Sequence, residues 1–300
     1  MNGLLQLRAT WAATVLAGRL SPALAARPAA RLWFTPWRVG ATPTSRQREA
    51  EWLAATEPLT VPFAGRRLHG FTAGAGPAVL LVHGWGDHAA RLGAFISPLV
   101  DSGHRVIGVD LPAHGASPGR QTNIFEGARA IAAAATHVGG VDAIVAHSLG
   151  GAETIVALER GLRVRAVALV ASAVRLTHAI EPFARMFALP PGAVTGLQRE
   201  IERRFGQGVW EELAADRAAR SLDAPALVVH DRDDPQVPFA DGERLAAAWP
   251  TATLHVTDGL KHHRVLRDPG VVTAVTDFLT TALGSTTDET SASARLLLDT

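Results

Sequence analysis

The chain contains no cysteine, which excludes disulfides, thiol nucleophiles and thiolate metal sites. It also lacks tyrosine and has one lysine, Lys261, so arginine carries almost all of the positive charge. The 29 basic and 28 acidic residues nearly cancel, which argues against recruitment of nucleic acid or of an acidic partner by a global field. We therefore expect the partners to be small molecules.

Long apolar runs are also missing. No stretch of roughly 18 uncharged apolar residues occurs, so we expect no transmembrane span. The apolar run near the N-terminus is short, and Arg19 interrupts it, so a signal peptide is not favoured. The cytoplasm is therefore the default compartment.

The first 48 residues differ from the rest in charge, because they contain seven arginines and no acidic residue. Three interpretations of this leader compete: a helix docked on the body, a basic anchor on anionic lipid, and a cleaved signal. We favour docking of residues 1–56, because LWFTPW (Leu32–Trp37) offers aromatic side chains that would bury well. Contact of the leader with a membrane surface is the less favoured alternative.

Short apolar runs alternate with helix-like segments over residues 57–174 and 223–283. The first runs predict an antiparallel hairpin around Ala64-Gly65. The later runs are apolar on both faces, which is typical of a parallel sheet covered by helices on both sides. The fold class is therefore predicted to be α/β, with a mostly parallel twisted sheet. The later predicted strands are residues 78–84, 105–110, 142–148, 165–172, 224–231 and 253–257.

The alternation breaks over residues 175–222, where no strand-like run occurs. A helical insertion of this size within a sheet predicts a lid. Phe183, Met186 and Phe187 are candidates to line a substrate pocket beneath it, although packing of the insertion on the body explains them equally well. Residues 284–300 contain STTDETSAS, which is typical of a flexible tail.

The segment AHSLGG places Ser148 where a predicted strand turns into a helix. A serine at so tight a turn must adopt a strained backbone, which needs small residues two positions away, here Ala146 and Gly150. The turn exposes the hydroxyl and aims the amino end of the helix at it. This arrangement is typical of a nucleophile.

An oxyanion formed beside Ser148 would need two preorganised N–H donors. Leu149, the next residue, is the candidate for one of them. The turn VHGWGDH follows the first parallel strand, and Trp85 in it is the candidate for the other. We interpret His83 in the same turn as a packed, hydrogen-bonded loop histidine.

A base histidine needs a carboxylate that fixes its tautomer and stabilises its cation. Asp231, Asp233 and Asp234 in VVHDRDDPQVP are all candidates by residue type. GLKHHR then provides adjacent His262 and His263 after the last predicted strand. The chain order is therefore serine, aspartate, histidine.

With HGWG, VDLPAHGAS, AHSLGG, VVHDRDDPQVP and GLKHHR in this order, the sequence resembles the α/β-hydrolase superfamily of serine hydrolases over roughly residues 57–283. The resemblance implies Ser148 as nucleophile, Asp234 as acid and His262 as base, with oxyanion donors from Trp85 and Leu149. Glycines of the family pattern are replaced by Ala146, Asp231 and Lys261. We expect the Lys261 side chain to extend into water, because a cation held against the base would lower the pKa of that histidine.

The expected activity is cleavage of a carboxylic ester or related acyl bond through an acyl-enzyme on Ser148. Two alternatives stay open: acyl transfer to an alcohol or peroxide by the same residues, and an inert hydrolase fold that binds a ligand.

No cofactor is expected. None of the 12 histidines has the spacing of a metal site, so none is predicted. Turn chemistry or packing explains Asp110, His114 and His147.

Overall fold

The computed structural model describes residues 2–37 and 42–284, and the predicted tail lies outside these residues apart from Gly284. The described residues form one eight-stranded sheet in the order β1-β2-β4-β3-β5-β6-β7-β8. Pairing is antiparallel between β1 and β2 and between β2 and β4, and parallel elsewhere. The predicted α/β class is therefore confirmed. The strands are β1 (Glu57–Phe63), β2 (Arg66–Ala73), β3 (Ala78–Val82), β4 (Arg105–Val109), β5 (Ala143–His147), β6 (Ala166–Val170), β7 (Ala226–Asp231) and β8 (Ala252–Thr257).

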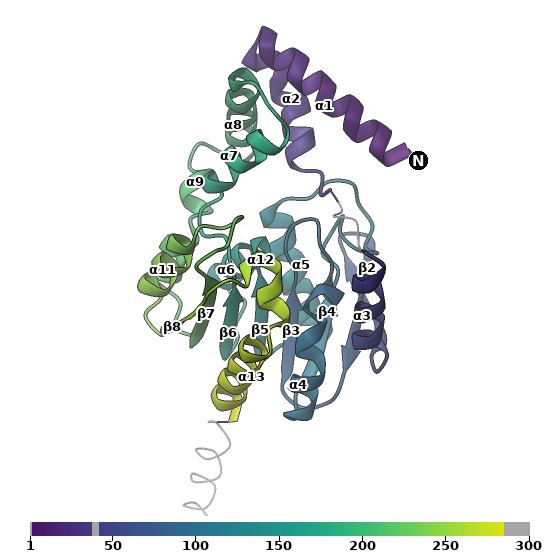
Figure 1. Cartoon of the computed structure of the whole chain (residues 1–300), viewed down its shortest axis with the longest axis vertical. Helices are drawn as coiled ribbons and strands as arrows, with labels where there is room; N and C mark the ends of the chain where they lie inside the picture. The colour runs from purple at the N-terminus through teal and green to yellow at the C-terminus, as the bar shows by residue number, and fades with distance from the viewer. Residues whose placement is uncertain (1, 38–41, 285–300) are drawn as a thin grey trace, which may run out of the picture.

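Helices cover both faces of the sheet (Figure 1). Buried side chains place α5, α6 and α11 on one face, and η1, α4 and α13 on the other. The α-helices are α1 (Asn2–Leu20), α2 (Pro22–Trp33), α3 (Pro43–Leu53), α4 (Ile96–Asp101), α5 (Ile124–His137), α6 (Leu149–Glu159), α7 (Thr177–Met186), α8 (Pro191–Phe205), α9 (Val209–Glu212), α10 (Ala215–Ala219), α11 (Phe239–Ala248), α12 (Lys261–Arg264) and α13 (Pro269–Gly284). Two short 3-10 helices are η1 (Ala89–Phe95) and η2 (Val265–Arg267).

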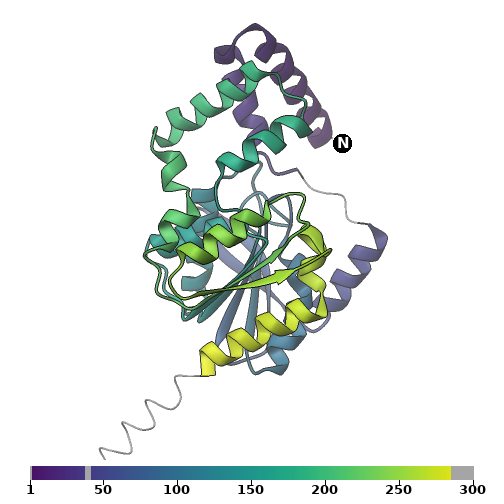
Figure 2. The same ribbon diagram turned by 60° about the vertical axis from the view of Figure 1, so that its left-hand side comes forward.

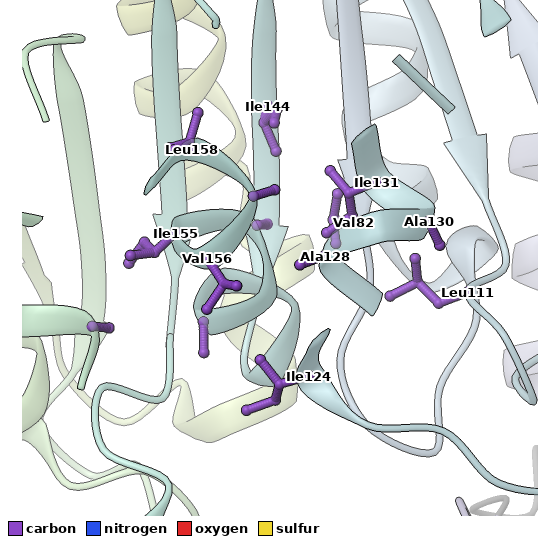
Figure 3. Packing of buried hydrophobic residues seen from close by; sticks show 14 of the residues in the cluster. Val82, Leu111, Ile124, Ala128, Ala130, Ile131, Ile144, Ile155, Val156 and Leu158 are labelled. Carbon is purple, nitrogen blue, oxygen red and sulfur yellow. The ribbon is translucent and has the colours of Figure 1, made fainter. Parts of the chain in front are cut away.

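The central strands are apolar on both faces because each face meets a layer of helices. In β3, Leu80 packs into the cluster under α5 and α6, whereas its neighbour Leu81 packs into the cluster under α4 and α13. Figure 3 shows the first cluster, in which Ile144 of β5 lies with Ile131 of α5 and Ile155 of α6. Burial on both faces fixes the register of these strands and so fixes where each one ends.

The hairpin of β1 and β2 turns at Ala64 and Gly65, which have φ angles of 47° and 73°. Positive φ at both central residues is the signature of a two-residue turn that matches the twist of the strands. The hairpin extends the sheet beyond β4 and leaves the carboxyl ends of β3, β5 and β7 free to carry polar groups.

A helical cap lies beyond one end of the sheet and is built from two distant parts of the chain (Figures 1 and 2). We define it as residues 2–37, which hold α1 and α2, together with residues 177–212 of the insertion, which hold α7, α8 and α9. Of the leader helices, α1 and α2 lie against α8. Their backbones approach closely, since a Cβ atom at Gly196 would lie 2.3 Å from the carbonyl oxygen of Pro22.

The third leader helix, α3, packs instead beside η1 on the body, and Gly93 accommodates its Trp52, because a Cβ atom there would lie 2.5 Å from the indole ring. Across residues 2–37 and 42–284, no helix combines the length and apolar character needed to cross a membrane.

Candidate active site

Ser148 sits on the sharp turn between β5 and α6 with a strained backbone, at φ 53° and ψ −125°. Its N–H donates to the carbonyl of Val170, at 3.1 Å. Its own carbonyl accepts from the N–H groups of Gly151 and Ala173, at 3.0 and 3.2 Å. A Cβ atom at Gly150 would lie 2.3 Å from the carbonyl oxygen of His83, so this position requires glycine. The strained turn predicted from AHSLGG is therefore present.

Three side chains from separate loops meet above the carboxyl edge of the sheet. His262 donates from Nδ1 to Oδ2 of Asp234, at 2.7 Å. Its Nε2 therefore accepts, and the Oγ hydroxyl of Ser148 lies 3.0 Å away. The side chains of His262 and Asp234 are 4% and 0% exposed, so the bond between them is shielded from water. The geometry is that of a nucleophile, a base and an acid in one connected chain.

Asp234 is ionised although it is buried. Burial alone would raise the pKa of Asp234, but the hydrogen bond from His262 and the main-chain N–H groups of Val237 and Gln236 outweigh it and hold the pKa below its usual value. A permanent carboxylate next to His262 favours the cationic form that a base histidine must reach.

Asp231 and Asp233, the other candidate acids, hold the loop that carries the base. Asp231 is fully buried and accepts from the N–H groups of Leu260 and Lys261, both at 2.9 Å, and from the hydroxyl of Thr257, at 2.7 Å. Burial acts to raise the pKa of Asp231, but these bonds prevail and lower it. Asp233 accepts from Gly259 N–H at 3.1 Å. The aspartate that replaces a family glycine at 231 thus fixes the approach of His262.

Lys261 has a φ of 61°, a left-handed conformation that glycine adopts freely. This explains the glycine of the family pattern at this position. The residue is exposed, and its N–H is bonded to Asp231. The side chain therefore extends into solvent, in agreement with the sequence-based expectation.

Two further imidazole rings surround the base. The ring centroid of His147 lies 4.7 Å from that of His262, and the centroid of His263 lies 5.0 Å from it. Burial, followed by the proximity of His262 and His263, places the pKa of His147 well below its usual value. Burial also lowers the pKa of His263, with His262 as the second cause. Both neighbours of the base are therefore neutral at neutral pH.

The turn after β3 lies directly against Ser148. A Cβ atom at Gly84 would lie 2.9 Å from the Cβ of Ser148, so the main chain itself approaches the nucleophile. His83 anchors this turn, because it donates to the carbonyl of Gly84 and accepts from Leu111 N–H, at 2.8 and 3.0 Å. His83 is thus the packed loop histidine that the sequence predicted.

The two predicted oxyanion donors follow these anchored residues. Trp85 comes directly after Gly84, and Leu149 begins α6 directly after Ser148. Neither N–H donates to an acceptor within the part of the chain that the structure describes. Both groups are therefore available to a negatively charged oxygen beside Ser148.

A cavity of about 620 Å³ opens above Ser148 and extends under the helical cap. Phe183 and Met186, two of the three predicted substrate-binding residues, line it. Phe187 is not among the lining residues. It follows the last residue of α7 and packs edge-on against Trp37, at 5.0 Å between centroids. Its ring contacts fit the alternative left open for these residues, packing of the insertion on its surroundings.

Several lining residues were missed by sequence reasoning. Trp33 and Trp37 come from the leader, Phe205 from α8 and Phe125 from α5. The aromatic density of LWFTPW was the available signal, but it indicated burial without showing which surface would cover it. Polar lining groups, including Asp87, Arg91, Gln236 and His263, lie at the end that holds Ser148. Among the described residues, no three carboxylate or imidazole groups are arranged to hold a metal ion.

Comparison with known proteins places the chain in a family. A family model described as "Alpha/beta hydrolase family" matches residues 79–275. A short segment of 47 residues is 49% identical to the pimeloyl-[acyl-carrier protein] methyl ester esterase of Methylococcus capsulatus, but it spans only 16% of this chain and 18% of that protein.

Solved structures resemble the fold over most of the chain. A monoacylglycerol lipase of Paleococcus ferrophilus is 25% identical, with a TM-score of 0.57, over 72% of this chain and 99% of that one. An esterase of Pyrococcus furiosus is 17% identical, with a TM-score of 0.64, over 83% and 99% of the two chains. Given the sheet order, the strained serine turn and the matched residues, the chain belongs to the α/β-hydrolase family.

Proposed function

We propose that this hydrolase cleaves carboxylic esters through an acyl-enzyme formed on Ser148. The observation that carries the proposal is the connected pair of hydrogen bonds, 3.0 Å from Ser148 to His262 and 2.7 Å from His262 to Asp234. A serine hydroxyl is a weak nucleophile unless an adjacent base takes its proton. His262 is positioned for that role, and Asp234 holds it in the required tautomer.

In the first half of the reaction, Oγ of Ser148 attacks the carbonyl carbon of the ester while Nε2 of His262 takes the hydroxyl proton. The carbonyl oxygen becomes an oxyanion, which the N–H groups of Trp85 and Leu149 stabilise. The carbon–oxygen bond to the leaving group then breaks, and His262 gives its proton to the departing alcohol. The acyl group is left on Ser148.

In the second half, water takes the place of the alcohol. His262 accepts a proton from the water as it attacks the acyl carbon, and the same two N–H groups stabilise the second oxyanion. Collapse of this intermediate returns the proton to Ser148 and releases the carboxylic acid. The apolar cavity beneath the cap supports a substrate with an aliphatic or aromatic acyl group. The similarity to a named lipase and a named esterase supports an ester as the substrate.

A fluorophosphonate probe tests the proposal, because it reacts covalently with an activated serine. We expect labelling of the wild-type protein at Ser148, established by peptide mass spectrometry, and none in Ser148→Ala. The same pair is then assayed with p-nitrophenyl octanoate, and the variant is expected to lose several powers of ten in kcat with its circular dichroism unchanged. Equal ester turnover by both proteins, or a wild-type protein that neither reacts nor turns over, would refute the acyl-enzyme.

A further inference from the structure

A small crevice lies next to the active-site cavity, between α3 and η2. Its volume is about 20 Å³, and its polar lining is Ser45, Arg48, Glu49, Arg91, His263 and Arg267. A space of this size admits about one oxygen-sized group, so a larger ligand would sit at its mouth with one atom inside. We call it the arginine crevice.

The carboxylates near the crevice are already engaged. Glu49 accepts from Arg91 at 3.2 Å and lies 3.0 Å from Nε2 of His88. Asp87 accepts from Arg91 at 2.9 Å. Asp268 uses its carboxylate to cap α13, where it accepts from Val271 N–H at 3.1 Å. Arg91 is therefore neutralised within the protein.

Arg48 and Arg267 are not neutralised. Neither guanidinium forms a hydrogen bond or an ion pair with any residue of the described ranges 2–37 and 42–284. Burial, followed by the proximity of Arg48, Arg264 and Arg91, lowers the pKa of Arg267. Burial is the first cause of that shift, and the three neighbouring arginines add repulsion between cations. An anion at this point would relieve the repulsion, and guanidinium groups bind phosphate through paired N–H bonds.

The crevice is connected to the reaction centre, because Arg91 and His263 line both it and the main cavity. The base gives its proton to the leaving group, so the leaving group lies on the side of His262. His263 is the next residue, and it lines the arginine crevice together with Arg267. The cap side of the cavity is apolar and suits the acyl group. The leaving-group side therefore ends at unpaired positive charge.

We propose that the arginine crevice binds a phosphate group carried by the leaving group of the ester substrate. This inference rests on the proposed ester hydrolysis, because that reaction determines where the leaving group lies relative to Ser148. Two unpaired guanidiniums, Arg48 and Arg267, match the double charge of a phosphate better than the single charge of a carboxylate.

Two esters that differ only in this group provide the test: octanoyl-glycerol and octanoyl-glycerol phosphate. In the wild-type protein we expect kcat/KM to favour the phosphorylated ester by about tenfold, the worth of one charge-assisted hydrogen bond. The double variant Arg48→Gln/Arg267→Gln should lose this preference. Arg163→Gln, at an exposed arginine after α6, is the matched control and should keep it.

A second measurement does not depend on turnover. Inorganic phosphate should raise the melting temperature of the wild-type protein above that in chloride of equal ionic strength, and this rise should disappear in the double variant. Equal kcat/KM for the two esters would overturn the inference and leave the proposed ester hydrolysis intact, even if free phosphate still stabilised the protein. If neither ester were hydrolysed, the proposed function would fail, and the absence of a phosphate effect on melting would reject the crevice as an anion site as well.

Discussion

His147 donates its Nε2–H to the main-chain carbonyl of His262, at 3.0 Å. The bond joins the residue before Ser148, at the end of β5, to the residue that carries the base on α12. Because Nε2 holds the proton, Nδ1 of His147 is left without a hydrogen-bond partner, and this nitrogen faces the turn at Gly84. The neighbour of the nucleophile thus fixes the main chain of the base.

His147→Phe should therefore impair turnover while preserving the packing of the ring. We expect kcat to fall about fivefold, because one buried hydrogen bond contributes about 1 kcal/mol, with KM for p-nitrophenyl octanoate little changed. His104→Phe is the control, since His104 is also buried but bonds to Thr280, remote from the site. A parallel loss of kcat in both variants, or none in His147→Phe, would show that the bond does not position the base.

Asp234 and Asp231 lie three residues apart and should fail in different ways when each is replaced by asparagine. Asp234→Asn removes the charge that supports His262 and presents an amide N–H to Nδ1, so we expect kcat to fall by about 10³- to 10⁴-fold. Asp231→Asn turns an amide N–H toward the N–H groups of Leu260 and Lys261. We expect it to lower the free energy of unfolding by about 2–3 kcal/mol, since buried donors would lose their acceptor.

Urea unfolding and steady-state kinetics on both variants separate the two roles. Asp234→Asn should keep nearly the wild-type midpoint of unfolding, and Asp231→Asn should shift it strongly. If Asp231→Asn abolished turnover without loss of stability, the assignment of Asp234 as the partner of the base would be wrong.

The sheet could be predicted from the sequence because its determinants are local. Each central strand is apolar on both faces, and the turn at Ser148 is encoded by the small residues beside it. The structure also brings Ser148, Asp234 and His262 together, although their catalytic roles stay a prediction. Among three aspartates, the spacing of the family pattern selected Asp234, and physical chemistry alone left all three open.

The walls of the cavity could not be predicted in the same way. Trp33 and Trp37 reach the site because α2 packs on α8, more than 150 residues later in the chain. Such packing depends on the shapes of two helices, including the close approach at Gly196, and no local pattern records it. The same limit applies to Phe183, Met186 and Phe187, for which the sequence left cavity lining and packing equally open.

Lys261→Gly should preserve activity and slightly increase stability. The left-handed backbone costs a residue other than glycine about 1–2 kcal/mol, and the extra flexibility of glycine in the unfolded chain cancels about half of that. We expect a gain of up to about 1 kcal/mol in the free energy of unfolding. Lys261→Ala, which removes the same charge but keeps the strain, should show no gain. An equal displacement of the pH–rate midpoint in both variants would show that the ammonium group acts on His262.

Trp37 belongs to the leader and lines the cavity, so we expect it to affect substrate selection. Trp37→Ala enlarges the apolar end of the cavity, so we expect kcat/KM for p-nitrophenyl octanoate to fall about tenfold, with a much smaller effect on the acetate ester. Trp210→Ala serves as control, because this tryptophan belongs to the same cap but bonds to Glu202 and does not line the cavity. Equal losses on both esters would mean that Trp37 stabilises the cap without contacting the acyl chain.

Glu153, on the helix that follows Ser148, is expected to make stability depend on pH. It is buried on α6 against α5, where a Cβ atom at Gly127 would lie 2.2 Å from its Oε1. Burial raises the pKa of Glu153 well above its usual value, so the folded protein keeps the carboxyl protonated at a pH where the unfolded chain ionises. The contribution of Glu153 to stability is therefore complete below the pKa that this group has in the unfolded chain. It is lost as pH rises toward the pKa that the group has in the folded protein.

Glu153→Gln cannot ionise, so its melting temperature should exceed that of the wild-type protein by a margin that grows between pH 5 and pH 8. Each kcal/mol gained is worth about 2–4 °C in a domain of this size. Glu159→Gln on the same helix is the control, since Glu159 is exposed and pairs with Arg217 at the surface, and its margin should not grow. A margin for Glu153→Gln that is the same at both pH values would mean that the carboxyl ionises equally in the folded and unfolded chains, and that a charge is accommodated between α5 and α6.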